Sequence, residues 1–107
     1  MKPFSNASKK NTIRKHFIER NVHTCYYCGI EETEFINIWG DFYGIKRGHR
    51  LEIGRKDNGK GYDIDNCVMA CALCNCAKSD VITFDEFKEI GKVVRQLWIK
   101  RRSSGKE

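Results

Sequence analysis

The clearest hydrophobic pattern in the chain lies near its C-terminus. Apolar residues recur there at the three- and four-residue spacing of one helix face: Phe87, Ile90, Val94, Leu97 and Trp98. Thr83 and Glu86 are spaced as a capping box, in which each side chain bonds the other residue's backbone N–H. The last turn is basic, which suits the negative end of a helix dipole. The pattern predicts a C-terminal helix over residues 83–102.

A shorter helical pattern lies near the N-terminus. Three apolar residues recur at helical spacing there, namely Ile13, Phe17 and Ile18. Thr12 precedes them as a suitable N-cap, so a helix is predicted from Thr12 to about Arg20. Residues 1–11 are polar and basic and are predicted to be a flexible arm.

Short strands are predicted between these two helices. Residues 35–39, FINIW, fit a short strand or a buried turn. Residues 51–53 alternate in polarity, and residues 67–70 form a second apolar run, as expected for two strands. Residues 57–59, Asp-Asn-Gly, supply the turn chemistry of a hairpin between them. A short helix is expected over residues 75–78.

The cysteine spacing adds a metal site to this picture. Two Cys-x-x-Cys units are present, and they comprise Cys25, Cys28, Cys71 and Cys74. This spacing lets two thiolates of one tight turn occupy adjacent corners of a zinc tetrahedron, and four thiolates make a closed structural site. Cys67 and Cys76 are expected outside the ligand set, with an exchange of Cys76 for Cys74 as the alternative.

Composition and charge narrow the class of protein. The 107 residues are 40% hydrophobic and 32% charged, which indicates one globular domain over residues 1–107. No apolar run reaches the roughly 20 residues needed to span a bilayer, and no apolar signal segment opens the chain. A cytoplasmic location is therefore expected, where reduced thiols favour metal over a disulfide scaffold. The net charge of +6 fits a nucleic-acid partner, or else a solvated basic surface.

Residues 51–80, LEIGRKDNGKGYDIDNCVMACALCNCAKSD, resemble the ββα-metal motif of the HNH (His-Me finger) endonucleases. The resemblance rests on a strand, a turn ending in Gly-Tyr, Asn66, a Cys-x-x-Cys, Asn75 and Lys78, and it covers roughly residues 25–98. It implies a small zinc-stabilised α+β domain, with knuckles and ββα core over residues 25–80 and a flanking helix at each end. It further implies hydrolysis of double-stranded DNA with Mg²⁺ or Mn²⁺ bound between hairpin and helix.

The first strand departs from the usual pattern of the family. The family has Asp-His where this chain has Gly54-Arg55. A branch that includes phage HNH proteins and PacI-type restriction endonucleases has Asp-Arg, and a bacterial or phage origin is therefore expected. By this resemblance Arg55 binds the scissile phosphate, Asn66 braces the loop and Asn75 completes the metal site. Gly54 leaves the catalytic metal without its usual carboxylate.

Several residues are candidates for the missing chemistry. An arginine cannot act as a base near neutral pH, so another group must activate water. Tyr27 fills the aromatic position that the branch has inside the first knuckle and is a candidate activator or nucleophile. His49 shares the strand parity of Arg55 and is a candidate base, or else a phosphate contact. Glu52 shares the parity of Gly54 and could replace the missing metal carboxylate.

Basic residues near the motif are predicted to contact DNA, and they are Lys46, Arg47, Arg50, Lys56, Lys60 and Lys78. The first hypothesis is a DNA endonuclease, acting as a homodimer because one active site cuts one strand. The alternative is a DNA-binding or regulatory module that has lost cleavage through Gly54. A third hypothesis, a purely structural zinc-knuckle interaction protein, leaves the basic surface unexplained.

Overall fold

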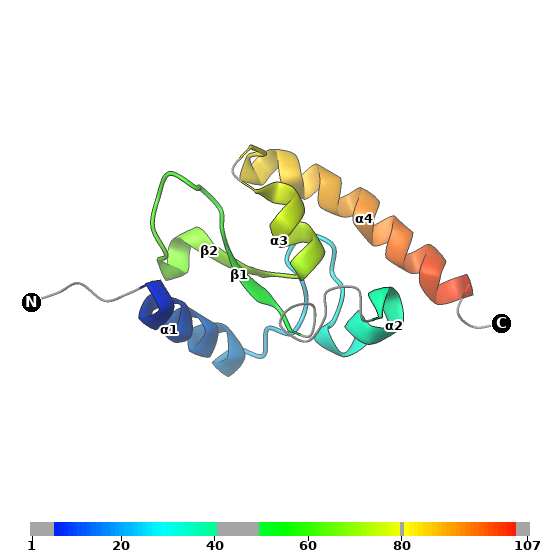
Figure 1. The fold of residues 1–107 in the computed structure, drawn as a ribbon, viewed down its shortest axis with the longest axis horizontal. Helices are drawn as coiled ribbons and strands as arrows, with labels where there is room; N and C mark the ends of the chain where they lie inside the picture. Colours follow the sequence, from blue (N-terminus) through cyan, green and yellow to red (C-terminus); the bar gives the residue numbers. More distant parts are fainter. Residues whose placement is uncertain (1–5, 41–49, 80, 105–107) are drawn as a thin grey trace, which may run out of the picture.

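The structure is a computed structural model that describes residues 6–40, 50–79 and 81–104. The elements follow in the order α1 (Asn6–Glu19), the 3-10 turn η1 (Glu32–Glu34), α2 (Phe35–Trp39), β1 (Glu52–Arg55), the 3-10 turn η2 (Ile64–Asn66), β2 (Cys67–Ala70), α3 (Ala72–Lys78) and α4 (Phe84–Ser104). Figure 1 shows a hairpin in the middle, with α1 on one side and α3 on the other. The predicted α+β class is confirmed.

The hairpin pairs β1 and β2 antiparallel, with Glu52 opposite Ala70 and Arg55 opposite Cys67. Every β2 residue is buried, because helices cover both faces. On one face, Ile13 of α1 joins Ile53 and Met69 in the core. On the other face lie α3 and the first knuckle.

The capping box of the C-terminal helix is confirmed. The Thr83 N–H donates to Glu86 Oε1 at 2.9 Å, and the Glu86 N–H donates to Thr83 Oγ1 at 3.1 Å. The predicted apolar face is only partly buried, since Phe87 is 0% and Trp98 2% exposed whereas Leu97 is 44% exposed. The helix touches α3 near its start and α2 near its end, so only part of that face meets the core.

Two local predictions are wrong. Helix α1 begins at Asn6, so Thr12 lies inside it and its hydroxyl donates to the Ser8 carbonyl at 3.1 Å. Part of the arm predicted to be flexible, residues 6–11, is therefore helical. The segment FINIW is helix α2 and not a strand or turn. Its buried residues, Phe35 and Ile38, are three apart, and a capping box at Glu31 and Glu34 precedes them.

The short helix after the second knuckle starts earlier than predicted. Cys71 is the N-cap of α3, and its Sγ accepts from the Cys74 N–H at 3.4 Å. The knuckle and the helix are therefore one continuous structure. Within the described part of the chain, no helix is both long and apolar enough to cross a membrane.

Candidate functional site

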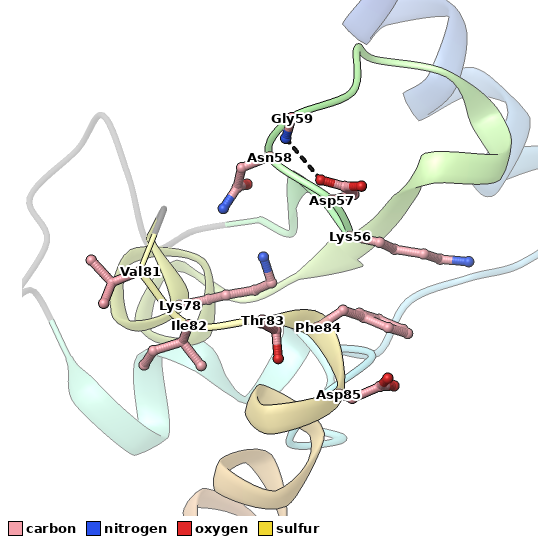
Figure 2. Close-up of a pocket in the computed structure, with 10 residues that line it drawn as sticks. All are labelled: Lys56, Asp57, Asn58, Gly59, Lys78, Val81, Ile82, Thr83, Phe84 and Asp85. Carbon is pink, nitrogen blue, oxygen red and sulfur yellow. Dashed lines mark hydrogen bonds between the residues drawn. The ribbon is translucent and has the colours of Figure 1, made fainter.

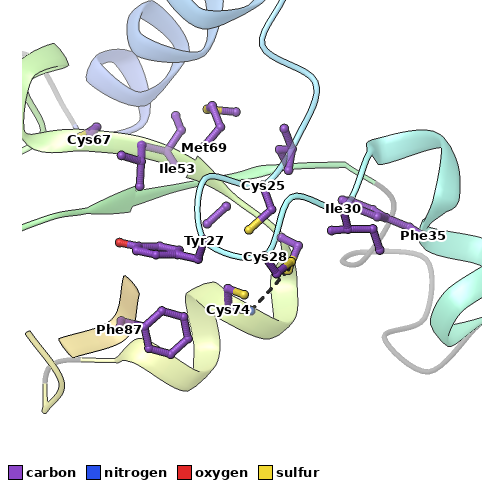
Figure 3. Close-up of a cluster of buried hydrophobic side chains, with 14 of the residues drawn as sticks. Cys25, Tyr27, Cys28, Ile30, Phe35, Ile53, Cys67, Met69, Cys74 and Phe87 are labelled. Atoms are coloured by element: carbon purple, nitrogen blue, oxygen red, sulfur yellow. Dashed lines mark hydrogen bonds between the residues drawn. The ribbon is translucent and has the colours of Figure 1, made fainter. Parts of the chain in front are cut away.

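The four predicted zinc ligands come together in the structure. The sulfurs of Cys25, Cys28, Cys71 and Cys74 all lie within 4.8 Å of one another, and all four residues are buried. Figure 3 shows three of them, Cys25, Cys28 and Cys74. The Cys28 and Cys71 sulfurs are 3.7 Å apart. Tetrahedral zinc with bonds of about 2.3 Å separates its sulfur ligands by about 3.8 Å. The donor set therefore fits a structural zinc ion in number, type and spacing.

The four sulfurs compete with one another for protons, and Trp98 donates a hydrogen bond to one of them. The Trp98 indole N–H donates to Cys28 Sγ at 3.2 Å, which links α4 to the first knuckle. Hydrogen bonds from Cys28, Cys71 and Cys74 lower the pKa of Cys25. Hydrogen bonding to Cys25 raises the pKa of Cys74, so the sulfurs share protons. A bound cation resolves this competition, because it allows all four sulfurs to be thiolates.

The face of β1 that meets α3 carries the candidate catalytic metal site. The Asn75 amide donates to Glu52 Oε1 at 3.0 Å. A Cβ added to Gly54 would lie 2.8 Å from Asn75 Oδ1. The alternation of side chains along a strand places Glu52 and Gly54 on this same face. Asn75 therefore occupies the space that a side chain at position 54 would fill, beside the carboxylate of Glu52.

Arg55 lies on the opposite face of β1. Its Nη1 donates to the Lys60 carbonyl at 3.2 Å, and its guanidinium carbon is 5.0 Å from the centre of the Tyr62 ring. The alternation that directs Gly54 toward Asn75 directs Arg55 away from it. The structure therefore brings Glu52, Gly54 and Asn75 together and leaves Arg55 apart from them.

Asn66 holds the loop between the strands. Its Oδ1 accepts from the Asp57 N–H at 3.1 Å, and its Nδ2 donates to the carbonyls of Asp57 and Gly61 at 3.0 and 2.9 Å. Its own carbonyl accepts from the Lys56 N–H at 2.7 Å. The Asn66 side chain therefore bonds to the backbone on both sides of the loop.

Tyr27 does not have the surroundings of a nucleophile. The residue is 7% exposed, and its ring packs edge-on against Phe87 at 4.9 Å between centroids (Figure 3). Within the described residues its hydroxyl has no hydrogen-bond partner. Burial raises the pKa of Tyr27, and the nearby Cys25 and Cys74 raise it further. The phenol is therefore neutral at physiological pH in this arrangement, which argues against the role of activator or nucleophile.

A cavity of about 440 Å³ lies between the loop after β1, the end of α3 and the start of α4. Its lining includes Lys56, Asp57, Lys78 and Phe84 (Figure 2). Lys78 is 4% exposed and lines this cavity, and its predicted contact with DNA stays a prediction. Lys56 is half-buried, with its ammonium 5.5 Å from the centre of the Phe84 ring.

The remaining predicted residues are placed unevenly. Arg50 and Lys60 are exposed, so a ligand can reach both side chains. Three others lie outside the described residues, namely Lys46, Arg47 and His49. Their predicted roles stay predictions.

Sequence reasoning missed a clamp at the start of β1. The Leu51 N–H donates to Glu32 Oε2 at 2.9 Å, and the Leu51 carbonyl accepts from Arg14 Nη1 at 2.7 Å. Burial lowers the pKa of Arg14, yet its guanidinium stays charged at any physiological pH. The Glu32 and Arg14 side chains thus satisfy the backbone groups of Leu51, next to Glu52, that a further strand would otherwise bond. The hydrophobic pattern of α1 carries no signal for such a long-range contact.

Comparison with solved structures decides the fold. The chain is similar to PacI, described as a rare-cutting HNH restriction endonuclease that perturbs DNA, with a TM-score of 0.67. The match covers 94% of this chain and 84% of PacI at 21% sequence identity. The chain has the HNH endonuclease fold. The ββα-metal arrangement expected from residues 51–80 is thereby confirmed, and β1, β2 and α3 are its three elements.

Sequence comparisons add a viral relative. Uncharacterized protein R423 of Acanthamoeba polyphaga mimivirus is 35% identical over 69 residues, which are 64% of this chain. The chain spans only 10% of that protein, so the likeness concerns a small part of it. No family model matches the chain.

Proposed function

We propose that this HNH-fold chain is a metal-dependent DNA endonuclease, stabilised by a structural zinc ion at its four cysteines. The observation that carries the proposal is the group formed by Glu52, Gly54 and Asn75 between hairpin and helix. The resemblance to the HNH endonucleases implies a catalytic metal between hairpin and helix, and this group lies between those elements. The likeness to an HNH restriction endonuclease supports the choice of DNA as substrate, and the net charge of +6 fits it.

The donor atoms of this group suit magnesium or manganese. Both ions prefer oxygen ligands, which Glu52 Oε1 and Asn75 Oδ1 provide. Asn75 now donates its amide N–H to Glu52, so both side chains already face one another. When bound, the ion would supply the positive charge that stabilises the phosphoryl transition state.

Glu52 takes the role that residue 54 has in the usual HNH pattern. The glutamate lies two residues before Gly54 and therefore on the same face of β1. With Asn75 Oδ1 2.8 Å from an added Cβ, an aspartate at position 54 would compete with Asn75 for space. The glycine thus leaves room for Asn75 beside the carboxylate of Glu52.

Other residues serve the substrate and the loop. Arg55 and the exposed Arg50 and Lys60 would bind DNA phosphates, since guanidinium and ammonium groups pair with them. Asn66 holds the loop that separates the strands. His49 remains the candidate base, and a homodimer would cut both strands.

The second candidate function is a DNA-binding module that no longer cuts, and the observation that favours it is Gly54. A carboxylate at this position is part of the usual metal site. If Glu52 does not replace it, metal affinity and cleavage are lost while the basic surface is kept.

Plasmid nicking with Mg²⁺ or Mn²⁺ tests the two functions. We expect the wild-type protein to nick supercoiled DNA, and Glu52→Gln to reduce the rate on the order of 10–100-fold. Glu89→Gln is the matched control, because Glu89 is an exposed carboxylate on α4 that pairs with Lys92. Cleavage by Gly54→Asp but not by wild type would establish the binding module instead. Binding without cleavage by either protein would rule out the endonuclease.

A further inference from the structure

Two cations converge on one aromatic ring on the α1 side of the hairpin. The Lys10 ammonium lies 4.8 Å, and the Arg55 guanidinium carbon 5.0 Å, from the centre of the Tyr62 ring. Lys10 belongs to α1, Arg55 ends β1, and Tyr62 lies in the loop between the strands. Helix α1 and the hairpin, which are distant in sequence, therefore build this group together, and we call it the Tyr62 cluster.

We propose that the Tyr62 cluster is a phosphate-binding site for the DNA backbone, separate from the metal side of the hairpin. The inference rests on the proposed function, because it takes DNA as the ligand. It adds α1 to the surface that meets DNA. Lys10 falls in the segment predicted to be a flexible arm, and neither Lys10 nor Tyr62 was predicted to bind DNA.

The charge of the cluster is the first argument. In the part of the chain that the structure describes, neither Lys10 nor Arg55 forms an ion pair with a carboxylate. A ring attracts each cation through its quadrupole but cancels none of their charge. Two like charges held at one ring repel each other, and a phosphate between or beside them relieves that repulsion.

The position of the cluster is the second argument. The Lys60 carbonyl accepts from Arg55 at 3.2 Å, and the Lys60 side chain is exposed, so a third cation lies on the same loop. A neighbouring cavity of about 450 Å³ is lined by Lys9 and Tyr62 but also by Asp63 and Asp65. These carboxylates repel a phosphate that enters the cavity. A phosphate held by Lys10 and Arg55 would therefore stay outside this cavity, where a duplex backbone can reach it.

The salt dependence of DNA binding tests the site. The logarithm of affinity falls with the logarithm of salt concentration, and each lost phosphate contact reduces the steepness of this fall by about 0.9 for duplex DNA. We expect Lys10→Ala to lower the slope by about that amount, and Lys10→Arg to restore it. Lys15→Ala is the matched control, because Lys15 lies on the same helix, its side chain is 79% exposed and it pairs with Glu19. The probe is a fluorescently labelled duplex, titrated from about 50 to 200 mM NaCl and followed by anisotropy.

The outcomes separate this proposal from the proposed function. An unchanged slope in Lys10→Ala, or an equal loss in Lys15→Ala, overturns the Tyr62 cluster while leaving cleavage untouched. A lowered slope with restoration by arginine supports it, even if the wild-type protein nicks no plasmid. Failure of the wild-type protein to bind duplex DNA overturns both proposals. Thermal melting of each variant is measured beside binding, and a loss that follows unfolding and is not restored by arginine counts against the site.

Discussion

Asn75 takes the volume that a side chain at position 54 would need. The ideal Cβ position at Gly54 is 2.8 Å from Asn75 Oδ1, whereas real Cβ atoms almost never come within 3.0 Å of another heavy atom. The amide is held there by its bond to Glu52. At this site, glycine is explained by packing against a specific side chain.

This close approach predicts a coupled pair of substitutions. We expect Gly54→Ala to lower the free energy of unfolding by about 1–3 kcal/mol, because the new methyl group must displace the Asn75 amide. In an Asn75→Ala background the same change should cost much less, since the obstructing amide is gone. Chemical denaturation of the four proteins measures the coupling energy. Equal costs in both backgrounds would show that position 54 does not compete with Asn75 for space.

Arg55 and Asn75 show how far residue-level reasoning from sequence reaches. Strand parity alone separated Arg55 from Glu52 and Gly54, and the structure has that separation. The partner of Arg55 could not be deduced, because Tyr62 reaches it through a loop whose path depends on Asn66. The burial of Lys78 was missed for a similar reason: its surroundings come from a helix junction and a hairpin loop.

Among the elements, the predictable ones have local signals. The capping box of α4 and the knuckle spacing are local, and both are seen in the structure. Helix α1 starts six residues before Thr12, because residues 6–11 are helical without an apolar periodicity that would predict it. The helix α2 is only five residues long. Over so short an apolar run, periodicity does not distinguish strand from helix, and the docking of α4 decides.

An ion pair attaches α4 to the segment before α2. Arg102 binds both carboxylate oxygens of Glu34, with Nη2 3.0 Å from Oε1, and Arg101 Nη1 donates to the Ile38 carbonyl at 2.7 Å. The hydrogen bond from Arg102 lowers the pKa of Glu34. These contacts fix the last turns of α4, where its apolar face is only partly covered.

The lowered pKa of Glu34 predicts the pH dependence of stability. A carboxylate whose pKa is lower in the folded state stabilises the fold above its unfolded pKa, near 4.5, and loses this effect as pH falls through the folded pKa. We therefore expect Glu34→Gln to destabilise the protein near pH 7 by about 1 kcal/mol, and less at pH 3. Urea denaturation at both pH values measures the difference. Glu89→Gln, an exposed site, should show no such dependence, and a constant cost for Glu34→Gln would contradict the assignment.

At the scale of the whole molecule, the cysteine site joins segments that lie far apart in the chain. Cys25 and Cys28 lie between α1 and η1, Cys71 and Cys74 begin α3, and Trp98 brings in α4 through Cys28. The candidate catalytic residue Asn75 directly follows Cys74, so the position of Asn75 against Glu52 depends on the second knuckle. Loss of zinc is therefore expected to displace Asn75 from Glu52 as well.

This arrangement predicts that zinc and fold are lost together. A 107-residue chain buries a modest core, and four close thiolates repel one another without a cation. We expect a strong chelator to abolish the cooperative thermal transition seen by circular dichroism, and added zinc to restore it. Cys28→Ser should bind less than one zinc per chain, while Cys76→Ser, an exposed cysteine outside the cluster, should bind one and melt like wild type. A chelated protein that keeps its melting transition would show that the hydrophobic core alone holds the two knuckles together.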